Sequence, residues 1–262
     1  MSSKLLQPEM KVPPTLKILL VGMTGGGRTS AMNVLLGRPG LTQTTASSQT
    51  TECKIEEREF NGQQLVVIDT PGLMHTEKGE DQVKKDIMEC IAAAAPGPHV
   101  FLLVMKSNRP TDGDKRTMEI IQEIFGPESK NYTLALFTGG DEFQPKDEDV
   151  QKTFLKGNIV GHHTFDNTGK KFPDQVPELL KKINNMVRKN GEEPIYTCDM
   201  LRKVQEVKVQ EMEKFKGDGP KEEQVLRNVV HRLLSGLVGE DVASSVLAKV
   251  DGLVKKVCDI VK

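Results

Sequence analysis

The chain has 262 residues, of which 37% are hydrophobic and 28% charged, and its formal net charge is −1. This length is too great for a minimal module and suits one large α/β domain with an extension, and the composition is ordinary for a soluble protein with a hydrophobic core. The near-zero net charge argues against nucleic acid as a partner, and no apolar run approaches the roughly 20 residues of a transmembrane helix. We therefore expect a cytoplasmic protein that has no transmembrane segment, with peripheral attachment to an organelle left open.

The four cysteines are scattered along the chain and form neither a CxxC pair nor a Cys/His cluster. This pattern favours reduced thiols in a cytosolic protein over zinc binding or a disulfide framework. The first 14 residues lack the apolar core of a signal peptide, and Pro13-Pro14 leads into the first expected strand.

Strand and helix signals alternate from Leu16 to about Lys189. Apolar runs predict strands at 16–22, 64–69, 99–105 and 132–138, and the loose alternation of 53–60 predicts an edge strand. A last strand should end near 164–167. Amphipathic stretches predict helices at 28–36, 80–95, 114–126, 147–157 and 176–189. The Asn61-Gly62 turn should pair the second and third strands as a hairpin. We predict an α/β fold whose sheet is mostly parallel, with one antiparallel edge strand and helices on both faces.

The pattern changes after Pro194. Residues 197–215 favour a charged helix, and two apolar stripes at helical spacing follow residue 220. The stripes leave three interpretations open: burial against the rest of the chain, a dimer or oligomer interface, or a membrane-surface face. We divide the chain into an N-terminal lead (1–15), an α/β domain (16–190) and a C-terminal helical extension (191–262).

The segment GMTGGGRT at 22–29 lies between an expected strand and an expected helix. It matches the phosphate-binding P-loop pattern at Gly22, Gly27 and Thr29, with Arg28 at the lysine position. Glycines let successive backbone N–H groups converge on phosphate oxygens, and the following helix adds the partial positive charge of its N-terminus. The alternative is a glycine-rich turn without a ligand. The candidate nucleotide-binding residues of this segment are Gly22, Thr24, Gly25, Gly26, Gly27, Arg28, Thr29 and Ser30.

A second motif, DTPG at 69–72, ends another apolar strand. Its Asp69 would hold Mg²⁺ together with the Thr29 hydroxyl, since Mg²⁺ prefers oxygen ligands. The Gly72 N–H would meet the γ-phosphate and change position when that phosphate leaves. A DTPG segment belongs to nucleotide switches, which argues against a small kinase.

These segments resemble those of the GIMAP (AIG1-type, immunity-associated) GTPases, relatives of the septins and of the Toc import GTPases of plants. The family's first nucleotide motif is matched by LLVGMTGGGRTSAMNVLLG, and its switch segment by SSQTTEC at 47–53. The most specific likeness is LLVMKSNRPTDGDKRTMEIIQEIFG at 102–126, which is similar to the family's own box and aligns its Arg, Thr and Asp with Arg109, Thr111 and Asp114. The base-reading segment is matched by ALFTGGDEF at 135–143, and the last nucleotide loop by FDN at 165–167.

The resemblance implies a G domain with extra C-terminal helices that binds GTP and GDP with Mg²⁺ and forms a homodimer or oligomer through its nucleotide face. Members hydrolyse GTP slowly or hardly at all, and some oligomerise on lipid droplets or other organelles. It places Thr50 beside Thr29 and Asp69 as a Mg²⁺ ligand, and it assigns guanine recognition to Asp141 and Asn167.

Thr50 is a candidate catalytic residue as well as a Mg²⁺ ligand, and two further candidates each have a plainer alternative. Arg109 would act as a catalytic finger across a dimer, or else it is a surface arginine. His75, which follows the DTPG motif, would orient the attacking water, or else it is a solvent-facing loop histidine.

The sequence departs from the family pattern inside the site. Arg28 replaces a compact lysine with a wide planar fork, which would weaken nucleotide binding about ten- to hundredfold or bind phosphate through two bonds. Gly139-Gly140 replaces the lysine that normally packs along the purine and braces the phosphate loop, and Asp166 replaces the first asparagine of the last loop. Two functions remain open: a GIMAP-type switch with slow hydrolysis coupled to dimerisation, or a pseudo-GTPase that serves as an interaction scaffold.

Overall fold

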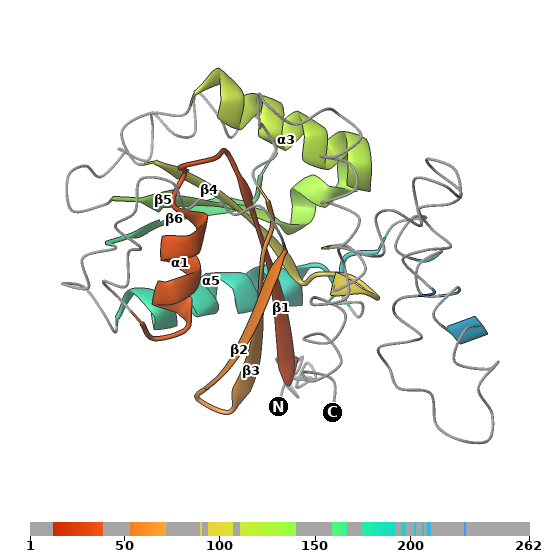
Figure 1. Cartoon of the computed structure of the whole chain (residues 1–262). Helices are drawn as coiled ribbons and strands as arrows, with labels where there is room; N and C mark the ends of the chain where they lie inside the picture. The colour runs from red at the N-terminus through yellow and green to blue at the C-terminus, as the bar shows by residue number, and fades with distance from the viewer. Residues whose placement is uncertain are drawn as a thin grey trace, which may run out of the picture.

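The structure is a computed structural model that describes residues 13–38, 53–71, 90, 94–106, 111–139, 159–166, 174–191 and 195–197, and single residues at 202, 206, 209, 210 and 228. Its six strands form one sheet in the order β2-β3-β1-β4-β5-β6 (Figure 1). The strands are β1 (Thr15–Gly22), β2 (Lys54–Phe60), β3 (Gln63–Asp69), β4 (Val100–Lys106), β5 (Thr133–Thr138) and β6 (Gly161–Phe165). All neighbouring strands run parallel except β2 and β3. The predicted sheet, with a single antiparallel strand at its edge, is confirmed.

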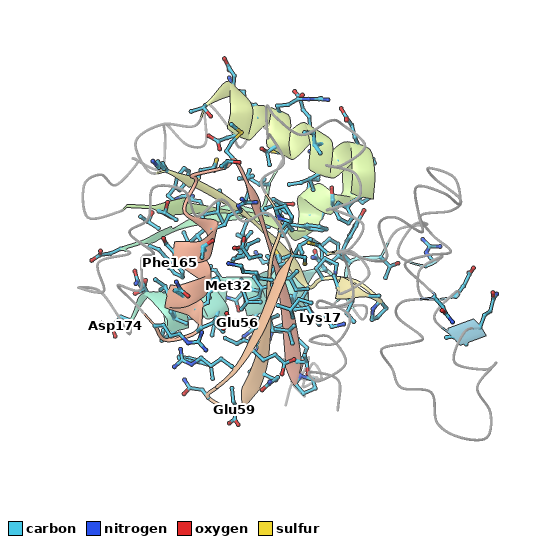
Figure 2. All side chains as sticks on the ribbon, in the orientation of Figure 1. Lys17, Met32, Glu56, Glu59, Phe165 and Asp174 are labelled. Carbon is cyan, nitrogen blue, oxygen red and sulfur yellow. The ribbon has the colours of Figure 1, made fainter. Side chains whose placement is uncertain are left out.

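The β2–β3 hairpin turns at the two residues that the sequence indicated. Asn61 has φ 49° and Gly62 has φ 79°, so both central residues are left-handed, as a two-residue turn that matches the twist of the strands requires. Glu59 lies close to this turn and is exposed (Figure 2).

Helices cover both faces of the sheet. These are α1 (Arg28–Leu35), α3 (Asp112–Phe125) and α5 (Gln175–Lys189), with a 3₁₀ helix, η1 (Pro127–Tyr132), before β5. Figure 1 shows α3 on one side of the sheet and α1 and α5 on the other. The expected helix at 147–157 and most of the one at 80–95 lie outside the described residues.

The core follows from the two-residue alternation of side chains along the strands. On one face of the sheet, Ile18 and Leu20 of β1 belong to one buried cluster with Met32 of α1 and Ile183 of α5. Phe165 at the end of β6 joins this cluster (Figure 2). On the other face Phe101 of β4 packs against Phe125 of α3, with 4.7 Å between ring centroids. The sheet is therefore held rigidly from both sides, which fixes the positions of its strand ends.

The segment after α5 is attached to the α/β domain through Tyr196. Its backbone N–H donates to the Pro98 carbonyl at 2.8 Å, and its hydroxyl donates to the Phe125 carbonyl. Its ring packs against Phe101 and Tyr132. Residues 202, 206, 209 and 210 are helical, as expected for 197–215. The residues of the apolar stripes after residue 220 lie outside the described residues, and the domain boundaries stay a prediction.

None of the helices in the described parts of the chain is long and apolar enough to span a membrane.

Candidate nucleotide site

The described candidate residues gather at the carboxyl edge of the parallel strands. Gly22 ends β1, Asp69 ends β3 and Thr138 ends β5, while Asp166 follows β6 directly. The carboxyl edge is where open α/β sheets bind ligands, because loops from several parallel strands meet there. The sequence motifs predict two parts of this candidate site: a phosphate half, formed by the ends of β1 and β3 with the start of α1, and a base half, formed by the ends of β5 and β6.

The loop at 22–29 has the backbone of a P-loop. Gly27 caps α1 with φ 94° and ψ 19°, a left-handed conformation that favours glycine. A side chain at Gly27 would begin 2.7 Å from the Thr138 Oγ1 atom, and one at Gly22 would collide with the Val104 carbonyl oxygen. The chain can follow this path only with glycine at these two positions, and the path leaves the N-terminus of α1 at the edge of the sheet.

Thr24 contributes a hydroxyl that fits a bound phosphate. Its Oγ1 atom is buried and has no hydrogen-bond partner among the described residues. A buried hydroxyl without a partner is costly, so an acceptor oxygen from a ligand would stabilise it. Together with the loop's glycines and the N-terminus of α1, this hydroxyl makes the chain's own residues fit a phosphate group.

Thr29 and Asp69 meet as the two motifs predict. The Thr29 hydroxyl donates to Asp69 Oδ2 at 2.9 Å, and Asp69 is fully buried. Both groups offer oxygen atoms of the kind that Mg²⁺ prefers. The donor set therefore suits Mg²⁺, but the same carboxylate also faces a cation of the protein itself.

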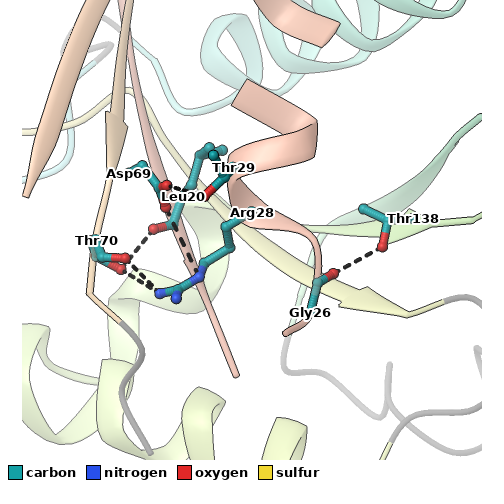
Figure 3. A network of polar contacts seen from close by, with 7 residues as sticks. All are labelled: Leu20, Gly26, Arg28, Thr29, Asp69, Thr70 and Thr138. Carbon is teal, nitrogen blue, oxygen red and sulfur yellow. Dashed lines mark hydrogen bonds and ion pairs between the residues drawn. The ribbon is translucent and has the colours of Figure 1, made fainter. Parts of the chain in front are cut away.

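That cation is Arg28, which is only 5% exposed. Its Nη1 atom donates to the Thr70 carbonyl at 2.6 Å and lies 3.4 Å from the Thr70 hydroxyl, and its Nε atom lies 3.9 Å from Asp69 Oδ1 (Figure 3). Burial lowers the pKa of the Arg28 guanidinium below its ordinary value, and the negative charge of Asp69 offsets only part of this effect. The side chain thus extends toward the end of β3, and its expected contact with phosphate stays a prediction.

Thr70 links the same elements and was not among the predicted site residues. Its hydroxyl donates to the Leu20 carbonyl at 2.8 Å, and its backbone N–H donates to the same oxygen at 3.2 Å (Figure 3). The start of the DTPG segment is thereby bonded both to β1 and to Arg28. The threonine inside the DTPG motif was the available signal, but its partners are 42 and 50 residues away in sequence.

Thr138 braces the phosphate loop from the base half. Its buried hydroxyl lies 2.8 Å from the Gly26 carbonyl and 3.2 Å from the Met105 carbonyl, so its single proton is shared between them. We expected Gly139-Gly140 to leave the loop without the brace that a lysine normally provides. Glycine supplies no such brace, but the hydroxyl of the preceding residue, Thr138, provides one of its own.

The backbone after β6 is held by Gln175 at the start of α5. The Gln175 amide accepts from the Asp166 N–H at 2.8 Å and donates to the Asp166 carbonyl at 3.0 Å, and both residues are buried. The Gln175 carbonyl in turn lies 3.0 Å from His163 Nε2. Burial and the charge of Lys182 lower the pKa of His163 to about 4, so near neutral pH it is uncharged and its Nε2–H donates to this carbonyl. Sequence analysis did not identify Gln175, since no motif contains it.

Several predicted site residues lie outside the described residues. They are Thr50, Gly72, His75, Arg109, Asp141 and Asn167. The structure does describe Thr111 and Asp114, the other two residues of the box that contains Arg109. They form a capping box, in which the Asp114 N–H donates to Thr111 Oγ1 at 3.2 Å and the Thr111 N–H donates to Asp114 Oδ2 at 2.9 Å. This pair starts α3 two residues before the predicted boundary, immediately after Arg109-Pro110.

The sheet order and the strand-end motifs define the chain as a protein with the P-loop GTPase fold. Residues 16–216 match the sequence model of the AIG1 family, and the chain belongs to that family. The immune-associated nucleotide-binding protein 9 of Arabidopsis thaliana is 30% identical over 213 residues, which cover 74% of this chain and 61% of that protein. Protein 8 of the same series is 31% identical over 232 residues, covering 81% of this chain and 65% of that protein. The chain spans about half to two thirds of the length of the curated relatives that it matches.

Solved structures show the same fold. Toc33 from Arabidopsis thaliana in complex with GDP and Mg²⁺ has a TM-score of 0.53 and 20% identity, covering 71% of this chain and 89% of that one. A dimerization-deficient mutant of Toc33 has a TM-score of 0.55 and 20% identity, covering 70% and 88%. The suspected relation to AIG1-type and Toc-like P-loop GTPases is confirmed.

Proposed function

We propose that this chain is a guanine-nucleotide-binding switch of the GIMAP type. The observation that carries the proposal is the folded P-loop at 22–29, whose Thr29 hydroxyl meets the Asp69 carboxylate in a chain of the AIG1 family. Backbone N–H groups of the loop would hold the phosphates, helped by the N-terminus of α1 and the Thr24 hydroxyl. The relatives named as nucleotide-binding proteins support the same assignment.

Guanine recognition rests on Asp141 and Asn167. A carboxylate at Asp141 would accept two hydrogen bonds from the guanine N1–H and N2–H₂ groups, which adenine lacks. Asn167 directly follows Asp166, whose backbone Gln175 holds on both sides. The backbone that leads into this loop is therefore held at the end of β6 by hydrogen bonds within the protein.

Hydrolysis of GTP would be slow at most. Mg²⁺, when bound, would lie on Thr29, Thr50 and Asp69 and would offset charge on the phosphates. Gly72 would report on the γ-phosphate, and His75 is the candidate for orienting water. No glutamine stands next to the DTPG segment in the sequence to take that role.

We also propose a homodimer or oligomer through the nucleotide face, with Arg109 reaching the partner's phosphates. A study whose structure resembles this fold, with a TM-score of 0.52, states that dimerization is important for the GTPase activity of atToc33 and psToc159. Turnover per molecule should therefore rise with protein concentration and vanish in Arg109→Ala. Turnover that is independent of concentration would contradict the dimer mechanism. Association with an organelle or lipid-droplet surface from the cytoplasm belongs to the same proposal.

A second function, a nucleotide-deficient scaffold, is favoured by one observation. Arg28 is bonded to Thr70 and lies beside Asp69, so its charge is already used within the protein. Calorimetric titration with GDP separates the two functions. We expect GDP to bind and ADP not to bind, and the Arg28→Lys variant to bind GDP more tightly. GDP binding by Arg28→Lys but not by the natural chain would favour the scaffold.

A further inference from the structure

We infer that Arg28 is a built-in cation of this site: its guanidinium occupies the electrostatic role of a metal ion at Asp69, so guanine nucleotide binds with little help from Mg²⁺. This inference rests on the proposed function and adds a property that family membership does not supply. It concerns the residue at which the chain departs from the P-loop pattern.

The first step is the charge balance at Asp69. This carboxylate is fully buried, and a buried charge needs compensation by a partner charge and hydrogen bonds. Both of its oxygens face groups from the first two residues of α1: Oδ2 accepts from the Thr29 hydroxyl at 2.9 Å, and Oδ1, which accepts no hydrogen bond among the described residues, forms an ion pair with Arg28 Nε at 3.9 Å. The protein thus places one positive charge of its own beside this carboxylate, where a bound divalent ion would place two.

The second step is the shape of the side chain. Arg28 reaches two partners at once, because Nη1 donates to the Thr70 carbonyl at 2.6 Å while Nε faces Asp69 (Figure 3). A guanidinium is a rigid fork with several donors, whereas a lysine ammonium is a single point charge on a flexible stem. A lysine here could hold one of these partners or reach the phosphates, but it could not reproduce the whole arrangement.

The third step is the packing that holds the fork in place. The arginine is almost entirely buried, and its stem passes beside Gly22, where an added Cβ would lie 3.6 Å from Arg28 Cδ. Thr70, its main partner, is itself fixed by two hydrogen bonds to the Leu20 carbonyl. Breaking a buried ion pair leaves the partner charge uncompensated, so release of Arg28 from Asp69 is costly.

The consequence concerns any second cation. Mg²⁺ requires near-ideal octahedral geometry and gives up its water reluctantly. At this site it would also approach a carboxylate whose charge Arg28 already offsets, and like charges at such short range repel. Mg²⁺ should therefore add little to nucleotide affinity, and replacing Arg28 by lysine should restore its contribution.

The test compares the GDP dissociation constant in about 5 mM Mg²⁺ with that in about 5 mM EDTA, by calorimetry, for the natural chain and for Arg28→Lys. We expect a change of less than about threefold in the natural chain and of about tenfold or more in Arg28→Lys. The matched control is Arg38→Lys, because Arg38 also pairs with a carboxylate, Glu56 at 2.6 Å, but is 50% exposed and outside the site. That control should behave as the natural chain does.

Each other outcome is decisive. Tightening of tenfold or more by Mg²⁺ in the natural chain overturns the inference and leaves the proposed function standing. An equally small change in Arg28→Lys also overturns it, since Arg28 is then not the cause. Failure of the natural chain to bind GDP in either buffer overturns the proposed function and the inference together. Circular dichroism checks the folding of the variants, and if Arg28→Lys does not fold, the ratio for the natural chain alone decides.

Discussion

The phosphate half and the base half of the candidate site each lack a lysine that the family pattern has at the corresponding position, and the chain compensates in different ways. In the phosphate half a larger cation, Arg28, takes the lysine position and is bonded to Thr70 beside a buried carboxylate. In the base half glycine takes the lysine position, and uncharged groups of Thr138 and Gln175 hold the backbone instead. One half is thus organised by buried charge and the other by neutral hydrogen bonds.

The difference between buried charge and neutral hydrogen bonds predicts how a substitution in each half affects ligand binding and stability. A buried ion pair contributes to stability only while both partners are present, and its charges compete with those of a ligand. Neutral hydrogen bonds contribute about 1 kcal/mol each and place no net charge in the site. We therefore expect that the replacement of lysine in the phosphate half changes how charged ligands and metal ions bind. The replacement of lysine in the base half should change mainly how firmly the backbone is held.

The largest expected effect is at the contact where the two halves meet. In Gly27→Ala the new Cβ would lie 2.7 Å from Thr138 Oγ1, and residue 27 would keep its left-handed φ of 94°. Overpacking and backbone strain together should lower the free energy of unfolding by about 3 kcal/mol and abolish measurable GDP binding. Urea unfolding and calorimetry measure the two effects.

Gly25→Ala is the matched control for this substitution. Gly25 also has a left-handed φ, 77°, but an added Cβ there meets nothing within 4 Å. Strain alone should cost about 1 kcal/mol. The two variants are compared by the free energy of unfolding alone, because Gly25 is itself a candidate phosphate-binding residue. Equal losses would show that the contact between Gly27 and Thr138 is not what holds the halves together.

The next prediction concerns the pH dependence of stability, to which a histidine of the base half should contribute. His163 supports the base half through Gln175, and burial, with a smaller effect of Lys182 and His162, lowers its pKa to about 4. The unfolded chain takes up this proton near the ordinary pKa of 6.5, while the folded chain does so only near 4. The contribution of His163 to the free energy of unfolding is therefore fully present above about pH 6.5 and is lost as the pH falls toward 4.

Between about pH 7.5 and pH 5 this histidine should account for a loss of about 2 kcal/mol in the free energy of unfolding. His163→Leu should flatten the pH dependence by that amount, whatever its stability at neutral pH. His99 lies outside the site beside Lys17, and burial also lowers its pKa to about 4, so part of the dependence should remain. If the pH dependence of the free energy of unfolding were unchanged in His163→Leu, the assignment of this proton uptake to His163 would be refuted.

Sequence patterns predicted most of the fold but only part of the site. Apolar runs located four of the six strands, loose alternation located β2, and only the end of β6 was indicated. The Asn-Gly turn located the antiparallel edge, because a turn signal depends on neighbouring residues. The loop glycines, Thr29 and Asp69 came from motifs whose spacing reflects a shared ligand. The contacts of Thr138 with Gly26 and of Arg28 with Thr70 join residues 112 and 42 positions apart. No local pattern encodes them, since they depend on the order of the strands in the sheet and on side-chain packing.

The smallest expected effect tests whether the brace of the base half serves the ligand or only the fold. Thr138→Val keeps the shape of the side chain but removes the hydroxyl shared between the Gly26 and Met105 carbonyls. The free energy of unfolding should fall by about 1 kcal/mol. Thr133→Val is the matched control, because Thr133 lies at the other end of β5, is equally buried and donates to the Ser129 carbonyl at 2.8 Å. Both variants should lose similar stability, but only Thr138→Val should weaken GDP binding, by about fivefold, since only its partner belongs to the phosphate loop. Equal GDP affinity in the two variants would mean that Thr138 supports the sheet without positioning the loop, and that the phosphate half is held by its own charges alone.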